Sequence, residues 1–440
     1  MDSLLSSPEG ERLTDVYGRE AVKEELRRAI VAGLKPPTDL TARAAAALKQ
    51  RFQPTVRRVL NGTGVLLHTN LGRSPLSQDA RAALGEVLSG YASVEFDAQT
   101  GERGRRQDHV RGPARDLFGA EDVIAVNNNA SAVFLALAAL ARGHGVLVSR
   151  GELVAIGGSF KIPEILEASG AQLIEVGTTN RTTLDDYRRA LAKDPALLLT
   201  VHPSNYEIRG FTERPQPEAL AALARGAGIP WLHDQGTGCV QPLDEFGVSG
   251  EPTVASCLAD GADLVTFSGD KLFAGPQAGF VAGRADLVAR LASHPIARVV
   301  RPDKLTFAAL AATIHAWKRG RWRDFPIYRA AAASLASLEE RGAAIAGALS
   351  RRAPGSTVEV VASSALFGGG TSPEKTFASR ALAVTVAGLS ADALAARWRD
   401  RALPLVGRIA EGRALVDLRS IQSEEDLELI DALAGAAGAP

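Results

Sequence analysis

Short apolar runs separated by helical or alanine-rich segments constrain the fold of this chain more than any other feature. Short, continuous apolar strands joined through helices are typical of a mostly parallel sheet with helices on both faces. In such folds, ligands bind beyond the carboxyl ends of the strands. The sequence therefore predicts an α/β fold with a ligand site along one edge of the sheet. The runs cover residues 123–126, 145–149, 172–176, 196–201, 229–234 and 263–267.

Composition excludes several classes of protein. The chain has 440 residues, is 46% hydrophobic and carries no net charge, which indicates a globular protein without a global preference for nucleic acid. No run of about 18 apolar residues occurs, and the first residues carry acids instead of a basic, then apolar, leader. We therefore expect a cytoplasmic protein that does not interact with a membrane. The two cysteines and seven histidines show no metal-binding spacing, so we expect no metal.

The chain divides into three parts by composition. Residues 1–53 have apolar positions at helical spacing among charges, and Pro54 ends the pattern. Residues 54–325 contain the predicted parallel sheet, and residues 326–440 are expected to form a small α+β domain with strands near 358–363 and 381–388. Within this last part, Gly368-Gly369-Gly370 precedes no clear helix start, so it is interpreted as a turn.

One lysine follows the last predicted strand. The apolar run stops at Ser268-Gly269-Asp270-Lys271, so Lys271 should project from a strand end. Burial disfavours the charged form of an amine and leaves a nucleophile that can form a Schiff base with an aldehyde cofactor such as pyridoxal 5′-phosphate. Ser268 could place its hydroxyl on the cofactor phosphate. A single loop lysine is more often a solvated charge, so the assignment depends on the rest of the chain.

Other strand ends supply compatible groups. Asp234 closes an apolar strand, where a carboxylate needs a partner, and a protonated pyridine nitrogen would be one. Asn205 follows another strand and could bond a cofactor hydroxyl. Asn129, Ala130 and Ser131 open a predicted helix, where free N–H groups bind phosphate, although plain N-capping explains them equally well. Together with Lys271, these groups make pyridoxal phosphate the favoured cofactor.

Charge asymmetry is confined to one stretch. Residues 298–323 are rich in Lys and Arg and include Trp317 and Trp322, which could serve phosphate groups or stack on bases. A solvated helix face and core tryptophans are the simpler explanation. Arg73 could bind an anion through its planar guanidinium. The chief rival, a nucleotide-binding module, lacks support because neither GxxxxGK[ST] nor a strand–GxGxxG–helix unit is present.

Taken together, these motifs resemble the bacterial selenocysteine synthase family, fold-type I pyridoxal phosphate enzymes that act as L-seryl-tRNA(Sec) selenium transferases. The likeness runs almost from end to end and keeps the order of the blocks. They are LNGTGVLLHTNLGRSPL, VNNNASAV, SRGELVAIGGSFKIPEI, EVGTTNRT, HPSNYEIRGF, FSGDKLFAGPQAG and RPDKLT.

The resemblance implies a role for each matching residue. Lys271 would carry the cofactor, Asp234 would lie at the pyridine nitrogen, and residues 129–131 would hold the phosphate. Arg73, Arg298 and Arg301 would form the pocket for the selenium donor, selenophosphate. The seryl group of seryl-tRNA(Sec) would lose its β-hydroxyl to give a dehydroalanyl intermediate, to which selenium adds.

The resemblance also implies partners and assembly. The family forms a ring of dimers with sites at subunit interfaces, and its members that act on tRNA carry a helical N-terminal domain, here residues 1–53. Family members usually have a further leading stretch, so we expect either a start upstream of Met1 or a shortened domain. Two alternatives stay open: a pyridoxal phosphate lyase of a small phosphorylated amino compound, and an inactive tRNA-binding relative.

Overall fold

The computed structural model of this chain describes residues 1–32, 38–156 and 160–438. It separates into two compact units, Met1–Val59 and Leu60–Pro440, which are treated one at a time. Three parts of the sequence predictions lie outside the described residues. They are residues 33–37 of the predicted N-terminal domain, residues 157–159 of the block SRGELVAIGGSFKIPEI and residues 439–440 of the predicted C-terminal domain.

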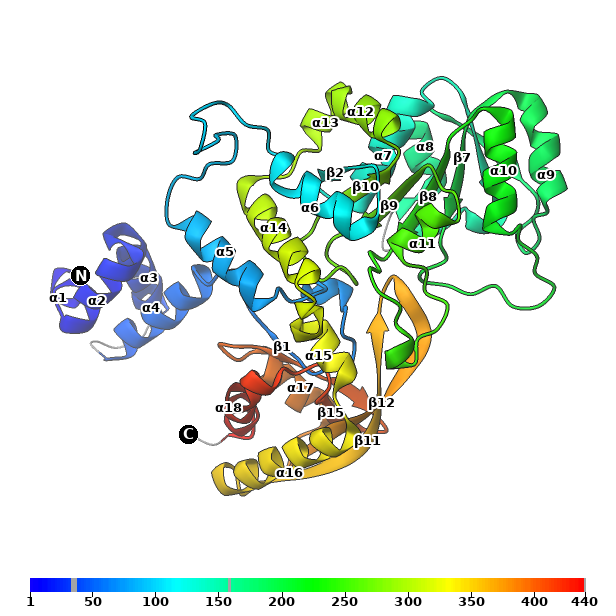
Figure 1. The fold of residues 1–440 in the computed structure, drawn as a ribbon. Helices are drawn as coiled ribbons and strands as arrows, with labels where there is room; N and C mark the ends of the chain where they lie inside the picture. The colour runs from blue at the N-terminus through cyan, green and yellow to red at the C-terminus, as the bar shows by residue number, and fades with distance from the viewer. Residues whose placement is uncertain (33–37, 157–159, 439–440) are drawn as a thin grey trace. The chain divides into compact units, whose positions relative to one another are not determined.

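The first unit is a small bundle of helices around its own apolar core (Figure 1). Val22, Leu26 and Ile30 recur at helical spacing; the first two are completely buried, whereas Ile30 is 44% exposed. Ser7 caps the second helix by accepting a hydrogen bond from the backbone N–H of Gly10. The boundary predicted at 53/54 and the role in tRNA binding stay predictions. The helices are α1 (Asp2–Leu5), α2 (Pro8–Tyr17), α3 (Arg19–Val31) and α4 (Thr38–Arg51).

The second unit is built on a seven-stranded sheet of order β2-β10-β9-β8-β7-β3-β6. All pairs from β9 to β6 are parallel, and only β10 runs antiparallel to its neighbours β2 and β9. Every strand predicted from an apolar run is present, with ends shifted by a residue or two; β10 was not predicted. The strands are β2 (Asp122–Val126), β3 (Gly145–Ser149), β6 (Gln172–Val176), β7 (Pro195–Val201), β8 (Trp231–Gly236), β9 (Leu264–Ser268) and β10 (Gly279–Gly283).

Helices cover both faces of this sheet (Figure 1). Successive residues of β2 show the alternation, because Val123 and Ala125 belong to one apolar core while Ile124 and Val126 belong to the other. Burial on both faces explains why the strands are continuously apolar, and it confirms the predicted fold class. One face packs against α6 (Asp108–Phe118), α9 (Leu184–Ala190), α10 (Pro217–Ala227), α11 (Val254–Ala259) and α14 (Lys304–Lys318). The other packs against α7 (Asn129–Leu140), α8 (Ile162–Ser169) and α12 (Ala285–Ser293).

The C-terminal part contains an antiparallel sheet of order β11-β12-β15-β14. Its long hairpin of β11 (Ser356–Gly368) and β12 (Thr371–Val386) turns at Gly369-Gly370, which confirms the predicted turn. Helices α16 (Leu335–Arg352), α17 (Ala391–Arg399) and α18 (Asp426–Ala436) share an apolar core with this sheet.

The remaining elements are short. They are β1 (Leu60–Asn61), β4 (Ala155–Ile156), β5 (Phe160–Lys161), β13 (Leu405–Val406), β14 (Arg408–Ala410), β15 (Arg413–Asp417), α5 (Gln78–Leu88), α13 (Pro295–Val299), α15 (Pro326–Ala332), and the 3₁₀ turns η1 (Thr69–Leu71), η2 (Arg150–Glu152), η3 (Leu191–Lys193), η4 (Asp244–Phe246), η5 (Arg321–Asp324) and η6 (Ser423–Glu425).

Two classes of feature are absent from the described part of the chain. None of its helices is both long and apolar enough to cross a membrane. Over residues 1–32, 38–156 and 160–438, no cluster of three or more His, Cys, Asp or Glu side chains could hold a metal ion.

Candidate functional site

Lys271 lies just beyond the carboxyl end of β9, as the sequence predicted. The chain turns sharply after Ser268, since the N–H of Gly269 bonds Ala278 O and the N–H of Gly275 bonds Gly269 O, each at 2.8 Å. The Lys271 side chain is buried, and its Nζ donates a hydrogen bond to the carbonyl oxygen of Gly236 at 3.2 Å. The amine is therefore held at the sheet edge where a ligand is expected.

The surroundings of Lys271 favour its neutral form. Burial, followed by the positive charge of Arg73, lowers the pKa of Lys271, and the carboxylates of Asp234, Asp270 and Glu251 oppose the shift only in part. A neutral amine is the nucleophile that forms a Schiff base with an aldehyde. The lowered pKa of Lys271 thus favours the Schiff-base chemistry expected of it.

Asp234 is the buried acid of the site. It lies on β8, where it pairs with Thr266 of β9, and it is 3% exposed. Its Oδ1 accepts hydrogen bonds from Asn129 Nδ2 at 2.7 Å and from Thr266 Oγ1 at 3.2 Å. Burial raises the pKa of Asp234, while the bond from Asn129 and the charge of Lys271 oppose that shift. A cationic partner such as a pyridinium N–H would stabilise the carboxylate.

Helix α7 begins directly after β2, with Asn128 as its N-cap. The Asn128 side chain accepts from Ser131 N at 2.8 Å, so Ser131 takes part in capping. Asn129 and Ala130 occupy the first turn, where backbone N–H groups lack acceptors within the helix and can bind an anion. The side chain of Asn129 is directed to Asp234, so this residue connects the helix start with the buried acid.

Two buried amide oxygens favour a polar ligand here. Asn129 Oδ1 and Asn205 Oδ1 are buried, and neither has a hydrogen-bond partner among the described residues. Such groups cost free energy unless a ligand or water satisfies them. Ser268, at the end of β9, is buried close to the turn that carries Lys271. The chemistry of these groups fits pyridoxal phosphate, which offers a hydroxyl, a ring nitrogen and a phosphate.

Arg73 forms a second polar wall beside the lysine. Its Nη1 donates to Asp270 Oδ2 at 2.7 Å, and its backbone is left-handed, with φ of 62°. The pair borders a cavity of about 440 Å³ together with Thr69, Ser74 and Gln277. Sequence reasoning missed Asp270, although it is adjacent to Lys271, because only the pairing with Arg73 gives it a role.

Arg298 and Arg301 lie in and just after helix α13 of this unit. Arg298 is in α13, and Arg301 Nη1 forms an ion pair with Glu95 Oε1 at 3.2 Å. No contact within the described residues joins either of them to Arg73. Their expected place beside Arg73 therefore stays a prediction.

The basic stretch 298–323 is largely paired within the unit. Lys318 binds Asp116 at 2.6 Å, and Arg319 binds Asp79 at 2.8 Å. Trp317 and Trp322 are buried and stack on each other with ring centroids 5.6 Å apart. The simpler explanation, core tryptophans beneath a charged surface, is the one the structure supports.

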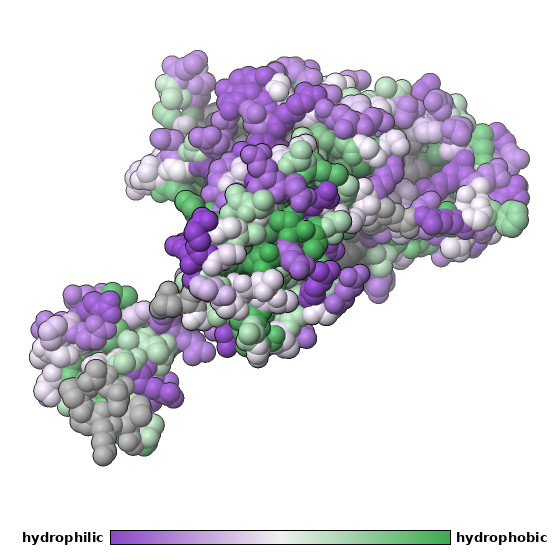
Figure 2. Space-filling model, turned by 90° about the horizontal axis from the view of Figure 1, so that it is seen from below, coloured by the Kyte–Doolittle hydropathy of each residue, from purple (hydrophilic) through white to green (hydrophobic). Residues whose placement is uncertain are grey.

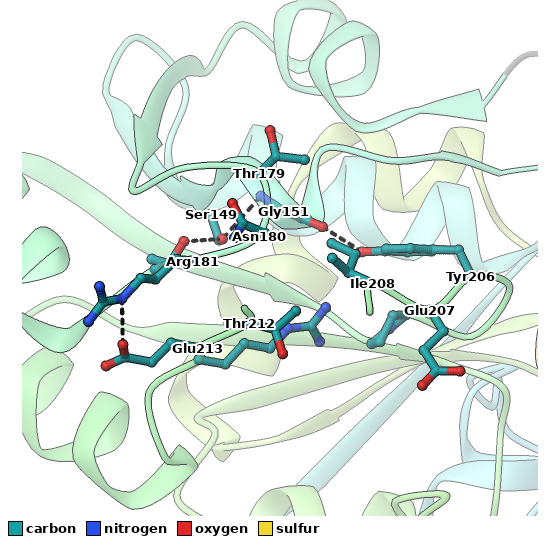
Figure 3. A pocket seen from close by; sticks show the side chains of 13 residues that line it. Ser149, Gly151, Thr179, Asn180, Arg181, Tyr206, Glu207, Ile208, Thr212 and Glu213 are labelled. Atoms are coloured by element: carbon teal, nitrogen blue, oxygen red, sulfur yellow. Dashed lines mark hydrogen bonds and ion pairs between the residues drawn. The ribbon is translucent and has the colours of Figure 1, made fainter. Parts of the chain in front are cut away.

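A groove opens beyond the carboxyl ends of β3, β6 and β7 (Figure 3). It has a volume of about 340 Å³ and lies beside the loop of Asn205. Tyr206 forms one wall, with its hydroxyl donating to Gly151 O at 2.6 Å, and Thr179 lines the groove beside Gly151. Glu152, adjacent to Gly151, is buried and accepts from Val201 N, and burial raises its pKa to about 7.

The hairpin turn of the C-terminal part also reaches the lysine, which sequence reasoning did not anticipate. A Cβ atom built on Gly370 would lie 2.7 Å from Lys271 Nζ. The triple glycine was the only available signal, and it was interpreted as a plain turn. The candidate site therefore includes residues from both parts of the second unit.

Comparison with known proteins identifies the family of this chain. Residues 59–422 match the model of the L-seryl-tRNA selenium transferase family. This chain belongs to that family. The L-seryl-tRNA(Sec) selenium transferase of Carboxydothermus hydrogenoformans is 42% identical to it, over 97% of this chain and 94% of the relative. The protein of the same name from Geotalea uraniireducens is 45% identical, over 86% of this chain and 82% of the relative.

A solved structure supports the fold of this L-seryl-tRNA selenium transferase family member. D-glucosaminate-6-phosphate ammonia-lyase has a TM-score of 0.59 at 20% identity, covering 89% of this chain and 98% of the lyase. This likeness concerns the fold alone. Among the alternatives raised from the sequence, the family match does not favour a lyase of a small phosphorylated compound.

Proposed function

We propose that this protein converts L-seryl-tRNA(Sec) to L-selenocysteinyl-tRNA(Sec), with pyridoxal 5′-phosphate as cofactor and selenophosphate as selenium donor. The observation that carries the proposal is the buried Lys271 beyond β9, with its lowered pKa and with the buried Asp234 close enough to influence it, in a chain of this family. Both groups are in place, which argues against an inactive relative.

The cofactor would be held by groups already described. Asn129, Ala130 and Ser131 would bind the phosphate at the start of α7, with Ser268 nearby, and Asn205 would bond the ring hydroxyl. When bound, pyridoxal phosphate supplies an aldehyde for amines and a protonated ring that accepts electron density. Asp234 would keep the ring nitrogen protonated, while Asn129 and Thr266 fix the orientation of its carboxylate.

Lys271 would carry the proton transfers. The overall reaction removes the proton from the seryl α-carbon and breaks the Cβ–O bond, so that the hydroxyl takes up a proton and leaves as water. It then forms a Cβ–Se bond and returns a proton to the α-carbon, and water cleaves the P–Se bond of selenophosphate to release phosphate. A buried amine whose pKa is lowered is more readily neutral, and a neutral amine can accept a proton and give it back. Burial at the sheet edge keeps competing water from the amine.

The selenium donor would bind at arginines. Arg73, held by Asp270 in the wall of a cavity near Lys271, would contact selenophosphate. We propose that Arg298 and Arg301 contribute from a neighbouring subunit in a ring of dimers. Exposed apolar side chains next to Glu95 and Arg301 support an interface there: Tyr91 and Phe96 on one segment, Val299 on the other. The larger unit also shows an apolar patch among hydrophilic residues from below (Figure 2).

The decisive experiment follows the amino acid on the tRNA. Purified protein with pyridoxal phosphate is incubated with radiolabelled seryl-tRNA(Sec) and selenophosphate, and the amino acid released from the tRNA is identified. Selenocysteine is expected. Unchanged serine from protein that holds the cofactor would contradict the proposal.

The first unit would bind the tRNA in the cytoplasm, where aminoacyl-tRNA is made. Its helix α4 carries exposed Arg43 and Lys49 that can pair with phosphates. Deleting residues 1–53 should leave cofactor binding intact and weaken tRNA binding by about 10-fold or more, with a smaller salt dependence. Filter binding at two salt concentrations measures this, and equal affinity of the two proteins would refute the role.

A further inference from the structure

The turn between β11 and β12 lies against the reactive amine. The nearest atoms to a Cβ built on Gly370 are Lys271 Nζ at 2.7 Å, Cε at 3.0 Å and Cδ at 3.5 Å. The backbone of Gly370 is left-handed, with φ of 84°. Any other residue here would be strained and would press on the amine. The turn is thus built to approach Lys271 with backbone alone.

The residue that follows presents a polar group without a partner. Thr371 is completely buried, and its Oγ1 has no hydrogen-bond partner among the described residues. A buried hydroxyl without a bond is costly, so its retention next to the turn needs an explanation. A ligand that reaches Lys271 would also reach this neighbourhood and could satisfy the hydroxyl.

A second segment fixes the turn in place. Leu66 N donates to Leu366 O at 3.0 Å and Leu67 N donates to Phe367 O at 2.6 Å, so residues 66–67 run beside the end of β11. His68 follows, and its Nδ1 is also buried without a partner in the part of the chain that the structure describes. Each of these two unsatisfied polar groups would gain a hydrogen bond from a polar ligand and would gain none from a hydrophobic one.

The charges around Lys271 indicate which polar ligand fits. The groups that influence the lysine are Arg73, which is paired with Asp270, and the carboxylates of Asp234, Asp270 and Glu251. The Thr371 hydroxyl is neutral, so it does not balance the charge of a free amino acid's carboxylate in this buried place. An amino acid joined to tRNA by an ester has no carboxylate, only a neutral carbonyl oxygen. A hydroxyl donor suits that oxygen.

We infer that the Thr371 hydroxyl donates a hydrogen bond to the ester carbonyl of the aminoacyl group, so that this turn selects an esterified amino acid over a free one. The inference rests on the proposed function and adds a specificity-determining residue to the same site. Gly370 complements it by leaving the Lys271 amine accessible.

The test compares two ligands that lack a β-hydroxyl and so bind without elimination. Full-length protein loaded with pyridoxal phosphate is titrated with L-alanine methyl ester and with L-alanine, and the visible absorbance of the cofactor reports binding. Thr371→Val, which removes the hydroxyl and keeps the shape, should weaken binding of the ester by about 3- to 10-fold and leave that of L-alanine unchanged. Thr371→Ser should preserve the preference. Equal weakening for both ligands, or none, would overturn the inference.

Matched variants separate this effect from misfolding and from failure of the proposed function. Thr376→Val alters an exposed threonine of the same strand and should change neither affinity. Gly370→Ala should abolish the absorbance band of bound cofactor, whereas Gly388→Ala, with φ of 78° and open space around it, should retain the band. A band that survives in Gly370→Ala would overturn the placement of the turn. Wild-type protein that takes up no cofactor would contradict the proposed function itself.

Discussion

Two groups of charged side chains in the larger unit behave differently. Lys271 and the three carboxylates around it are buried, and the pKa of the lysine is lowered while that of Asp234 is raised. Along residues 298–323, cations such as Lys318 and Arg319 lie at the surface and pair with acids of α6 and α5. The surface stretch is the more conspicuous in the sequence, yet the buried group is the one to which we assign the chemistry in our proposal.

The two groups behave differently because water reaches one and not the other. Water screens exposed ion pairs, so they add little stability and leave their members chemically ordinary. A buried charge must find a specific partner or change its protonation state, and either result can be used in catalysis. We therefore base the proposed site on buried charges and not on the density of charge along the sequence.

The largest effect is expected for Lys271→Ala. Removing the amine removes the nucleophile and the proton carrier together, so turnover should fall by at least about 10³-fold and the visible band of covalently bound cofactor should vanish. Absorbance and the seryl-tRNA conversion assay measure the two results. Unchanged turnover would show that the buried group around Lys271 is no more important for catalysis than the exposed one.

A smaller effect is expected on the folding stability, and not on catalysis, from the burial of Glu152. Burial raises the pKa of Glu152 to about 7, from an ordinary value of 4.5. As the pH rises from 4.5 to 7, the unfolded chain loses this proton before the folded chain does, so folding becomes less favourable by about 3 kcal/mol at most. Above pH 7 the folded chain has also lost the proton, so the stability falls no further.

Glu152→Gln, which cannot ionise, should lack this dependence. Denaturant unfolding at several pH values, with wild type and variant compared at each, checks the expectation. Parallel stability profiles for the two proteins would show that Glu152 is not insulated from water.

The smallest effect is expected at the surface. The bond from Lys318 lowers the pKa of Asp116, but the two side chains are 37% and 68% exposed. Lys318→Ala should shift the melting temperature by only about 1 °C and leave the cofactor spectrum unchanged. A large loss of bound cofactor in this variant would contradict the contrast between buried and exposed charges, because the basic stretch would then support the site.

Much of the fold could be predicted from local patterns. The apolar runs gave the parallel strands, and Thr183 is the N-cap of α9, where it forms a capping box with Asp186. The strand β10 was missed because its residues, Gly279–Gly283, follow a glycine- and proline-rich turn and look like part of it. Its direction depends on a partner on either side, β2 and β9, which no local pattern specifies.

The candidate site divides in the same way. Lys271, Asp234 and the start of α7 follow strand ends, so topology alone brings them to one edge of the sheet. The link from Asn129 to Asp234 and the pairing of Arg73 with Asp270 join residues that are distant in sequence. Side-chain direction decides these contacts, and periodicity carries no information about it.

The sequence by itself determined the layered α/β architecture and the family, and it predicted the lysine and acid of the candidate site, because strand periodicity and motif order are local properties. Only the tertiary structure decided that Gly370 and Thr371 lie at Lys271, that Asp270 holds Arg73, and that the tryptophans of the basic stretch are core. The physical reason is that burial and proximity depend on how distant segments pack, and that packing sets both the pKa of a buried amine and the polar groups a substrate meets there.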